Sequence, residues 1–342
     1  MNHDTAARKA VASIKADEWT TCYTRPAIRN YFDFWKDTIF IPLEVEHHFT
    51  KPIDGSSTQL HGYVDTIGYY KSDLGKAVVN LEHKTGAYDA NSDWNVWNNL
   101  AGVSGQIDLY DFGCNSDFDL SRHEIDYIKI PNFKPKRIPV GKDSEEPGTK
   151  SEVLNLKTYL GEPISDASHH FYESIGVKEN PELLEIRIDQ AIEANPEKYY
   201  HRFGGILRNE QNRQETKARL AQLMLEQERA KQDAANGLDP YYKNSNSCYA
   251  YGSWCQYLNL CNGTETTSAF DVKKPRNTGR TSFSRLSVWN SCRRKYKHQY
   301  IDGLQDPEHD PNALRKGSVV HEALEVFYRE IKEQEQLNNE SN

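Results

Sequence analysis

The feature that most constrains the fold is residues 59–88, QLHGYVDTIGYYKSDLGKAVVNLEHKTGAY, in which two runs of alternating apolar and polar residues flank a short turn. The runs cover residues 61–70 and 76–84, and the turn at 71–75 has the charge and the glycine that hairpin turns favour. Alternation of this kind is typical of strands with one buried face. The sequence therefore predicts a β-hairpin.

The hairpin carries one acid, Asp65, on its first strand and the triplet Glu82, His83, Lys84 on its second. Strand residues two apart share a face, so Glu82 and Lys84 lie together and Asp65 can join them from the paired strand. Two carboxylates beside one ammonium suit Mg²⁺ or Mn²⁺, because hard oxygen atoms hold such ions and the lysine can steady a water molecule or a phosphate. The alternative is an ordinary solvated Glu/Lys pair on a hairpin face.

Length and composition limit the class of protein. With 342 residues the chain can bury a sizeable core, and we expect about two domains. No window approaches the about 18 apolar residues of a membrane span, and the first residues lack the apolar centre of a signal peptide, so we expect a cytoplasmic protein. The net charge of −8 argues against a wholly basic nucleic-acid binder. Basic residues nevertheless cluster at 134–137, 273–280 and 293–297, and each cluster is either a binding surface or a solvated face.

Further elements follow from the same patterns. Alternation predicts strands at residues 43–49 and 124–130, and capping residues predict a helix at about 94–110. On that helix Gln106 and Tyr110 are four residues apart and share a face. A tyrosine at the edge of the core beside a surface glutamine is the alternative for this pair.

The C-terminal half has a helical character. Residues 181–234 have a helical pattern interrupted by Pro196 and by a Gly-Gly pair, and we expect a helical arm there without a catalytic element. Near the C-terminus we expect one helix that starts after Ser282 and carries Cys292, and a second at 317–331 with His321 near its start.

Four cysteines form a further candidate site. Cys248, Cys255 and Cys261 lie close together in the sequence, and Cys292 is a distant fourth. Because we expect a reducing compartment, a disulfide framework is disfavoured, and four thiolates suit a [4Fe-4S] cluster or a structural Zn²⁺. The wide spacing favours the cluster, and buried free thiols are the alternative.

Together these motifs resemble the RecB-type nuclease family of the PD-(D/E)XK superfamily, notably its iron–sulfur exonucleases, which include CRISPR-associated RecB-like nucleases and phage recombination nucleases. In that family, a helix of the form S-x-L-x₅-C-x₃-Y and a Gly-x₃-His helix come first. Here SRLSVWNSCRRKY and GSVVHEALE match them and supply Cys292, Gly317 and His321. In this chain those two helices come last, so the sequence looks circularly permuted.

The resemblance implies an α/β fold, with a mixed central sheet flanked by helices, a helical subdomain and a cysteine-bound cluster. It implies that Asp65, Glu82, His321 and the backbone carbonyl of His83 bind one or two Mg²⁺ or Mn²⁺ ions. Lys84 would position water or stabilise charge on the phosphate, and the Gln106/Tyr110 pair would orient Lys84 or the DNA backbone. Cys248, Cys255, Cys261 and Cys292 would hold the [4Fe-4S] cluster.

The activity that the resemblance implies is exonucleolytic cleavage of DNA, with single strands as the expected substrate, in recombination, repair or phage DNA processing. A recombination or helicase partner and self-association fit the same picture. The alternative is a DNA-binding or scaffold module with a structural Fe–S or zinc site and impaired catalysis.

The resemblance also divides the chain. Residues 1–135 would form the nuclease core, 136–243 a loop and helical subdomain, 244–261 the cysteine segment and 262–280 a linker. Residues 281–342 would then complete the core, either in their own chain or in a neighbouring molecule.

Overall fold

A computed structural model describes residues 3–73, 76–87, 105–140, 146–174, 176–250, 253–273, 279–307 and 312–340. Its centre is a six-stranded mixed sheet. Five strands follow one another across it in the order β1 (Phe40–Pro52), β2 (Gln59–Tyr70), β3 (Val79–Gly86), β4 (Arg122–Lys129) and β7 (Tyr200–Ile206), and the short β11 (Arg280–Thr281) pairs with β2. The β3–β4 and β2–β11 pairs are parallel and the others are antiparallel, which confirms the predicted mixed sheet.

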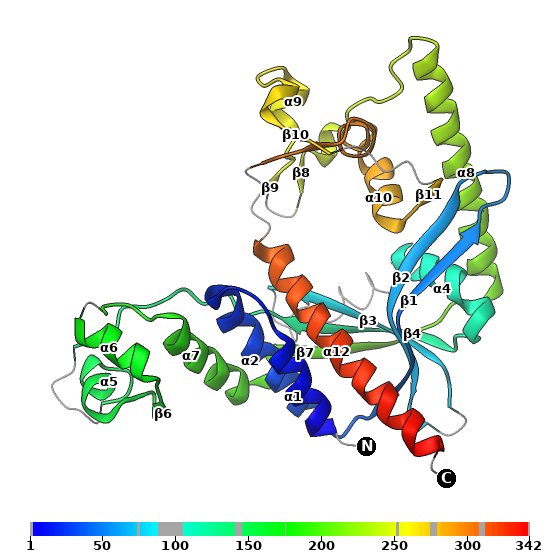
Figure 1. The fold of residues 1–342 in the computed structure, drawn as a ribbon. Helices are drawn as coiled ribbons and strands as arrows, with labels where there is room; N and C mark the ends of the chain where they lie inside the picture. The colour runs from blue at the N-terminus through cyan, green and yellow to red at the C-terminus, as the bar shows by residue number, and fades with distance from the viewer. Residues whose placement is uncertain are drawn as a thin grey trace.

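Helices cover both faces of this sheet (Figure 1). One face is covered by α1 (His3–Ser13), α2 (Glu18–Trp35) and α12 (Asn312–Glu340), and the other by α4 (Gly105–Phe118), α8 (Glu210–Ala235) and α10 (Phe283–Ser291). The predicted α/β architecture with flanking helices is therefore confirmed. No helix in the described part of the chain is long and apolar enough to cross a membrane.

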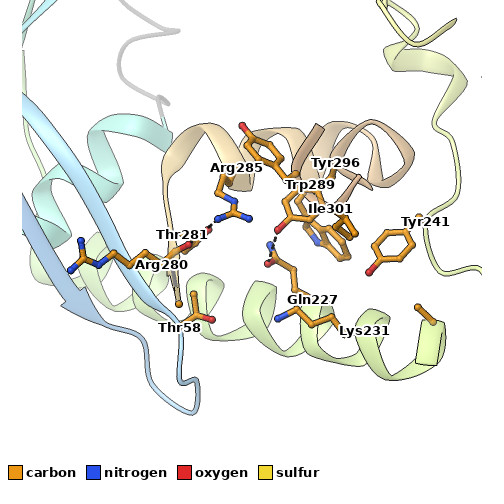
Figure 2. Close-up of a pocket in the computed structure, with 13 residues that line it drawn as sticks. Thr58, Gln227, Lys231, Tyr241, Arg280, Thr281, Arg285, Trp289, Tyr296 and Ile301 are labelled. Atoms are coloured by element: carbon orange, nitrogen blue, oxygen red, sulfur yellow. Dashed lines mark hydrogen bonds between the residues drawn. The ribbon is translucent and has the colours of Figure 1, made fainter. Parts of the chain in front are cut away.

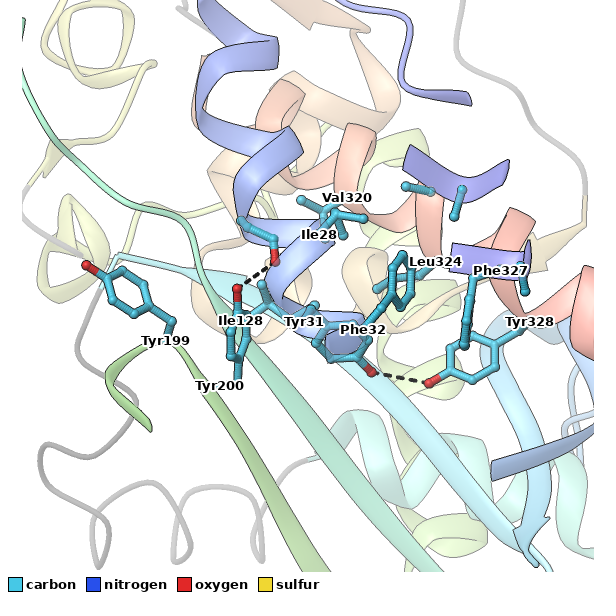
Figure 3. Close-up of a cluster of buried hydrophobic side chains, with 14 of the residues drawn as sticks. Ile28, Tyr31, Phe32, Ile128, Tyr199, Tyr200, Val320, Leu324, Phe327 and Tyr328 are labelled. Carbon is cyan, nitrogen blue, oxygen red and sulfur yellow. Dashed lines mark hydrogen bonds between the residues drawn. The ribbon is translucent and has the colours of Figure 1, made fainter. Parts of the chain in front are cut away.

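The longest helix brings the C-terminal segment onto the N-terminal half of the chain. Val320, Leu324 and Phe327 lie on one face of α12 because they are three or four residues apart, and all three are buried. Figure 3 shows them against Ile28 and Phe32 of α2, and the rings of Phe32 and Phe327 stack with centroids 4.2 Å apart. The apolar stripe of α12 thus fixes this helix to the sheet that carries the hairpin.

The predicted hairpin is present, but its strands pair over a short stretch. Residues 66–68 of β2 pair with residues 79–81 of β3, and β11 takes the same edge of β2 at Gln59 and Leu60. Between these two partners, residues 61–65 have no strand on that edge among the described residues. We call this stretch the open edge of β2.

The structure corrects two predictions made for the C-terminal half. The range 181–234, predicted to be helical, contains a strand. α7 (Pro181–Ala194), a 3₁₀ turn (Pro196–Lys198) and α8 are helical, and β7 lies between that turn and α8 as part of the central sheet. Gly205, with φ of 75°, lies near the end of this strand and does not interrupt a helix. The helix expected to run through Cys292 ends at Ser291, because Cys292 is extended and starts the short α11 (Arg293–Tyr296).

The remaining predictions are confirmed where the structure describes them. The strand predicted at 43–49 lies within β1, the strand predicted at 124–130 lies within β4 except for its last residue, and α12 contains the helix predicted at 317–331. The helix predicted at 94–110 is described only from Gly105, and its earlier part lies outside the described residues.

Two peripheral regions are built from short elements. The first contains α5 (Lys150–Leu156), β5 (Thr158–Tyr159), β6 (Glu162–Pro163) and α6 (Asp166–Ser174). The second contains β8 (Tyr249–Ala250), β9 (Ser253–Trp254), α9 (Leu258–Asn262), β10 (Asp271–Val272) and β12 (Leu304–Gln305).

Candidate active site

Asp65 lies at the C-terminal end of the open edge of β2, where it meets residues from β3 and α12. Its Oδ2 atom accepts a hydrogen bond of 2.7 Å from the backbone N–H of His83. The same oxygen lies 3.7 Å from Nδ1 of His321. Two residues that are far apart in the sequence, Asp65 and His321, are therefore neighbours in one chain.

Gly317 explains how α12 comes so close to β3. A Cβ atom at this position would lie 2.9 Å from Oγ1 of Thr85, a residue of β3, which is closer than real Cβ atoms approach other atoms. The glycine lies one turn before His321 on the same helix. The small residue therefore lets the helix bring His321 to the hairpin.

Glu82 is the second carboxylate, and it connects the hairpin to α4. Its Oε1 atom accepts hydrogen bonds from Nζ of Lys84 at 2.5 Å and from Nε2 of Gln106 at 2.9 Å. The second hydrogen of the Gln106 amide is donated to the hydroxyl of Tyr110 at 2.6 Å. The four residues of the two predicted motifs thus form one hydrogen-bonded chain.

One oxygen of Glu82 has no hydrogen-bond partner in the described part of the chain. The side chain is almost fully buried, and its Oε2 atom makes no hydrogen bond with any described residue. Burial and the nearby Asp65 raise the pKa of Glu82 to about 8, although Lys84 opposes them. A buried carboxylate oxygen without a donor is an available ligand for a hard cation.

Asp65 and His321 have the protonation states that a metal site needs. Burial raises the pKa of Asp65, but the hydrogen bonds and charge interactions with His83 and His321 outweigh burial and lower it. Burial also lowers the pKa of His321, against the opposing effect of Asp65. Near neutral pH, the first is a carboxylate and the second a neutral imidazole, which are the forms that bind divalent cations.

Glu46 is a third acid near this site that the sequence analysis missed. It follows a register shift in β1 and has φ of 51°, a left-handed conformation that is rare for a residue with a side chain. Burial, followed by the charges of Asp65 and Glu325, raises the pKa of Glu46 to about 7. Strict alternation along β1 would place Glu46 on the same face as Glu44 and His48. The sequence pattern therefore gives no indication that the Glu46 side chain lies near Asp65.

The ring of His83 lies inside the protein. It is 1% exposed and packs against Tyr328 of α12, with ring centroids 5.4 Å apart. Tyr328 in turn shares a hydrogen bond with Tyr31, whose hydroxyl donates to Asp126 at 2.6 Å. This buried network supports the backbone of β3 at the residue whose carbonyl was predicted as a ligand, and that ligand role stays a prediction.

The four cysteines lie in two segments that meet beside α10. The sulfur of Cys292 accepts hydrogen bonds from the backbone N–H groups of Asn244 at 3.4 Å and Lys295 at 3.5 Å. Burial, followed by Cys255, Cys292 and Cys248, raises the pKa of Cys261. The four sulfurs do not form a tight group, since the one close set of metal-ligating side chains in the described ranges is His169, His170 and Glu173 on α6.

The two cysteines without such neighbours have a simpler environment. Cys22 and Cys114 are fully buried free thiols, as expected for small apolar residues of the core. Burial raises the pKa of each to about 12, so both stay protonated.

Comparison with known proteins adds one finding. A family model described as the PD-(D/E)XK nuclease superfamily matches residues 280–342. This range contains β11, α10, α11 and α12, and with them Cys292 and His321, whereas the hairpin lies outside it. No curated protein and no solved structure matches the chain. The family match indicates a nuclease.

Proposed function

We propose that this protein is a metal-dependent DNA nuclease that hydrolyses phosphodiester bonds as an exonuclease, with single strands as its substrate. The observation that carries the proposal is the approach of His321 Nδ1 to Asp65 Oδ2, at 3.7 Å, beside the hydrogen-bonded Glu82, Lys84 and Gln106. The family match is independent support, because it rests on the sequence of the C-terminal segment that contains His321 and does not use the hairpin residues.

The side chains at the site are of the kinds that bind Mg²⁺ or Mn²⁺, although their ligand atoms, like the four sulfurs, do not all lie within 4.8 Å of one another. Asp65, Glu82 and His321 would hold them together with the carbonyl of His83, and Glu46 adds a further carboxylate. The fit rests on the donor set, which consists of hard oxygens, a neutral imidazole and the unpartnered Oε2 of Glu82. When bound, such an ion lowers the pKa of a water molecule and offsets charge on the phosphate.

The residues around the ligands have separate tasks in this proposal. Lys84 is 40% exposed at its side chain, so its ammonium can reach a phosphate or a water molecule in solvent while it contacts Glu82. Gln106 holds the Oε1 atom of Glu82 and leaves Oε2 free. Burial, followed by the charge of Glu82, raises the pKa of Tyr110, so its hydroxyl stays protonated beside the amide of Gln106.

The open edge of β2 supports a single-stranded substrate. A groove of about 210 Å³ runs beside it, lined among others by His61, Gly62, Tyr63, Gln106 and Tyr110. Tyr63 is 55% exposed and offers an aromatic face for a base. Unstacked bases of a single strand can use such a face, whereas the bases of a duplex are already stacked on each other.

The RecB-type assignment and the permuted order belong to the same proposal. So does a [4Fe-4S] cluster, or alternatively Zn²⁺, bound by Cys248, Cys255, Cys261 and Cys292. Support comes from the donor set of four thiols and from the two backbone N–H groups that point at the sulfur of Cys292, since such hydrogen bonds stabilise a thiolate. A recombination or helicase partner and self-association belong to the same proposal.

The test is a nuclease assay on end-labelled single-stranded and duplex DNA with Mn²⁺ or Mg²⁺. We expect the wild-type chain to shorten single strands from an end, and Asp65→Ala and Lys84→Ala to lower the rate by about a hundredfold or more. Lys71→Ala, at an exposed position in the hairpin turn, is the matched control and should leave the rate unchanged.

Equal rates for the wild-type chain, Asp65→Ala and Lys84→Ala would refute the assignment of the site. DNA binding without any cleavage would refute the nuclease and favour the DNA-binding scaffold.

A further inference from the structure

A second cavity lies away from the candidate active site, between α8, β11, α10 and the residues that follow α11 (Figure 2). Its volume is about 380 Å³, within the range of about 300–1,000 Å³ that small-molecule sites occupy. Its walls come from both halves of the chain, since Gln227 belongs to α8 and Trp289 to α10. We call it the donor pocket.

Four buried polar atoms in the wall of this pocket have no hydrogen-bond partner among the described residues. They are Nε2 of Gln227, Oγ1 of Thr281, Nε of Arg285 and Nε1 of Trp289. The side chains of Gln227, Thr281 and Trp289 belong to residues that are at least nine-tenths buried. Each unpaired buried donor costs stability, so four in one wall indicate that a ligand with acceptor atoms belongs there.

The pocket is also positively charged. Lys231, Arg280 and Arg285 line it, and no carboxylate among the described residues does. Lys231 is paired with Glu228, which lies outside the lining, at 2.6 Å. Arg285 donates from Nη1 to the carbonyl of Arg280 at 3.2 Å and lies over the ring of Tyr300, with 5.0 Å to its centroid, which holds the guanidinium in place without neutralising it. Unpaired donors together with the charge of the Arg285 guanidinium favour an anion.

The other part of the wall is aromatic. Trp289 contacts Tyr296 and Tyr241 edge-on, with ring centroids 5.1 Å and 6.4 Å apart. The hydroxyl of Tyr296 donates to Oε1 of Gln227 at 3.5 Å (Figure 2), and Nε2 of the same amide has no hydrogen-bond partner among the described residues. An anion that also carries a flat aromatic group satisfies both parts of the wall.

We propose that the donor pocket binds one nucleotide of a DNA strand, with its phosphate at the donors and its base against the aromatic wall. The inference rests on the proposed function only in taking that strand to be the substrate. Thr281 lines the donor pocket, and the next two residues, Ser282 and Phe283, line the groove beside Gln106 and Tyr110. The donor pocket and the groove therefore adjoin each other at β11 and the start of α10.

The test is the affinity for a fluorescent single-stranded oligonucleotide, measured with the full chain and without added divalent metal, so that no cleavage occurs. Arg285→Gln removes the charge, and Gln227→Met removes the donor at nearly constant size. We expect each to weaken binding by about tenfold or more. Arg229→Gln, at an exposed position on the same α8 that does not line the pocket, should bind as the wild-type chain does.

Thermal melting of all four proteins checks that each folds. Wild-type affinity in both folded pocket variants would overturn the inference. Free deoxynucleoside monophosphate that displaces the oligonucleotide at equal concentration would also overturn it, because the pocket would then serve free nucleotides. Failure of the proposed nuclease activity is a separate result. If the wild-type chain binds DNA but does not cleave it, and the pocket variants bind less tightly, the pocket inference stands without the nuclease. If the wild-type chain cleaves DNA and the pocket variants bind as tightly as the wild-type chain, the pocket inference alone is refuted.

Discussion

At the scale of single residues, the candidate active site is defined by carboxylates whose charge is not balanced. The charge of Asp65 raises the pKa of both Glu46 and Glu82, and Lys84 donates a hydrogen bond to Glu82. Such an arrangement is unfavourable for a metal-free protein at high pH and favourable for one that holds a divalent cation. The titration of Glu82 makes this measurable.

We predict that the metal-free protein loses stability as the pH rises from about 5 to about 8. The pKa of Glu46 is about 7 and that of Glu82 about 8, both above the ordinary glutamate value, because these groups are buried near Asp65. In this range the folded chain binds more protons than the unfolded chain, so the free energy of unfolding falls with rising pH. Asp65 has a lowered pKa and therefore titrates below this pH range. The pKa of His321 is lower in the folded chain than the ordinary histidine value, so at pH values below that ordinary value His321 makes the folded chain more stable as the pH rises and opposes the trend.

The measurement is the melting temperature of the metal-free wild-type chain and of Glu82→Gln across this range. The variant should lose less stability, because it lacks the buried titrating group. Added Mn²⁺ should raise the melting temperature of the wild-type chain most at the high end of the range, where the carboxylates are ionised. Parallel curves for the two proteins would contradict the prediction.

At the scale of elements, the protein brings segments from distant parts of the sequence to common sites. β11 and α10 connect the open edge of β2 to the cysteine-bearing region, and α12 brings His321 to β3. The cysteine region joins one segment around Cys248 to another at Cys292 through the hydrogen bond from Asn244. A bound cluster would connect the same two segments through four thiolates.

We predict that the protein purified without oxygen is brown and has the broad visible absorption of a [4Fe-4S] cluster. Cys292→Ala removes one thiolate and should bleach that absorption and lower the melting temperature. Cys114→Ala, at a buried cysteine outside the region, is the control that should keep the colour. A colourless protein with one equivalent of zinc would exclude the cluster and favour the zinc alternative.

Much of this arrangement follows from sequence, and its failures have physical reasons. Alternation predicted the hairpin because β2 and β3 each have a buried face, and helical spacing placed Gln106 beside Tyr110. β7 was missed because its Gly-Gly pair equally fits a helix interruption. Glu46 was missed because a left-handed residue beside a bulge leaves no periodic signal. The donor pocket is formed by tertiary contacts between α8 and α10, which no local pattern encodes.

At the scale of the whole molecule, the order of the motifs raises the question of which chain completes the site. In the structure, α12 packs on α1, α2, β1 and β3 of its own chain. The buried stripe at Val320, Leu324 and Phe327 is large enough to hold the helix there. In this arrangement the site is completed within one chain, and completion by a neighbouring molecule is the alternative to test.

We predict that mixing two inactive variants, Asp65→Ala and His321→Ala, restores no nuclease activity. If each chain completes its own site, every site in the mixture lacks one ligand. If a neighbour supplies α12, a share of the mixed assemblies pairs an intact hairpin with an intact helix. Activity that appears on mixing, and not in either variant alone, would show that the site is shared between molecules.

The contact between His321 and Asp65 also has a consequence for how the protein folds. The two residues are separated by most of the chain, and closing so long a loop costs entropy before any contact compensates for it. Contacts of such long range form late and slow the folding of a domain. During synthesis, the ribosome releases the hairpin long before it makes α12, so a nascent chain carries both carboxylates but lacks the imidazole. The order of the sequence thus delays assembly of the candidate metal site until nearly all of the described sheet is available.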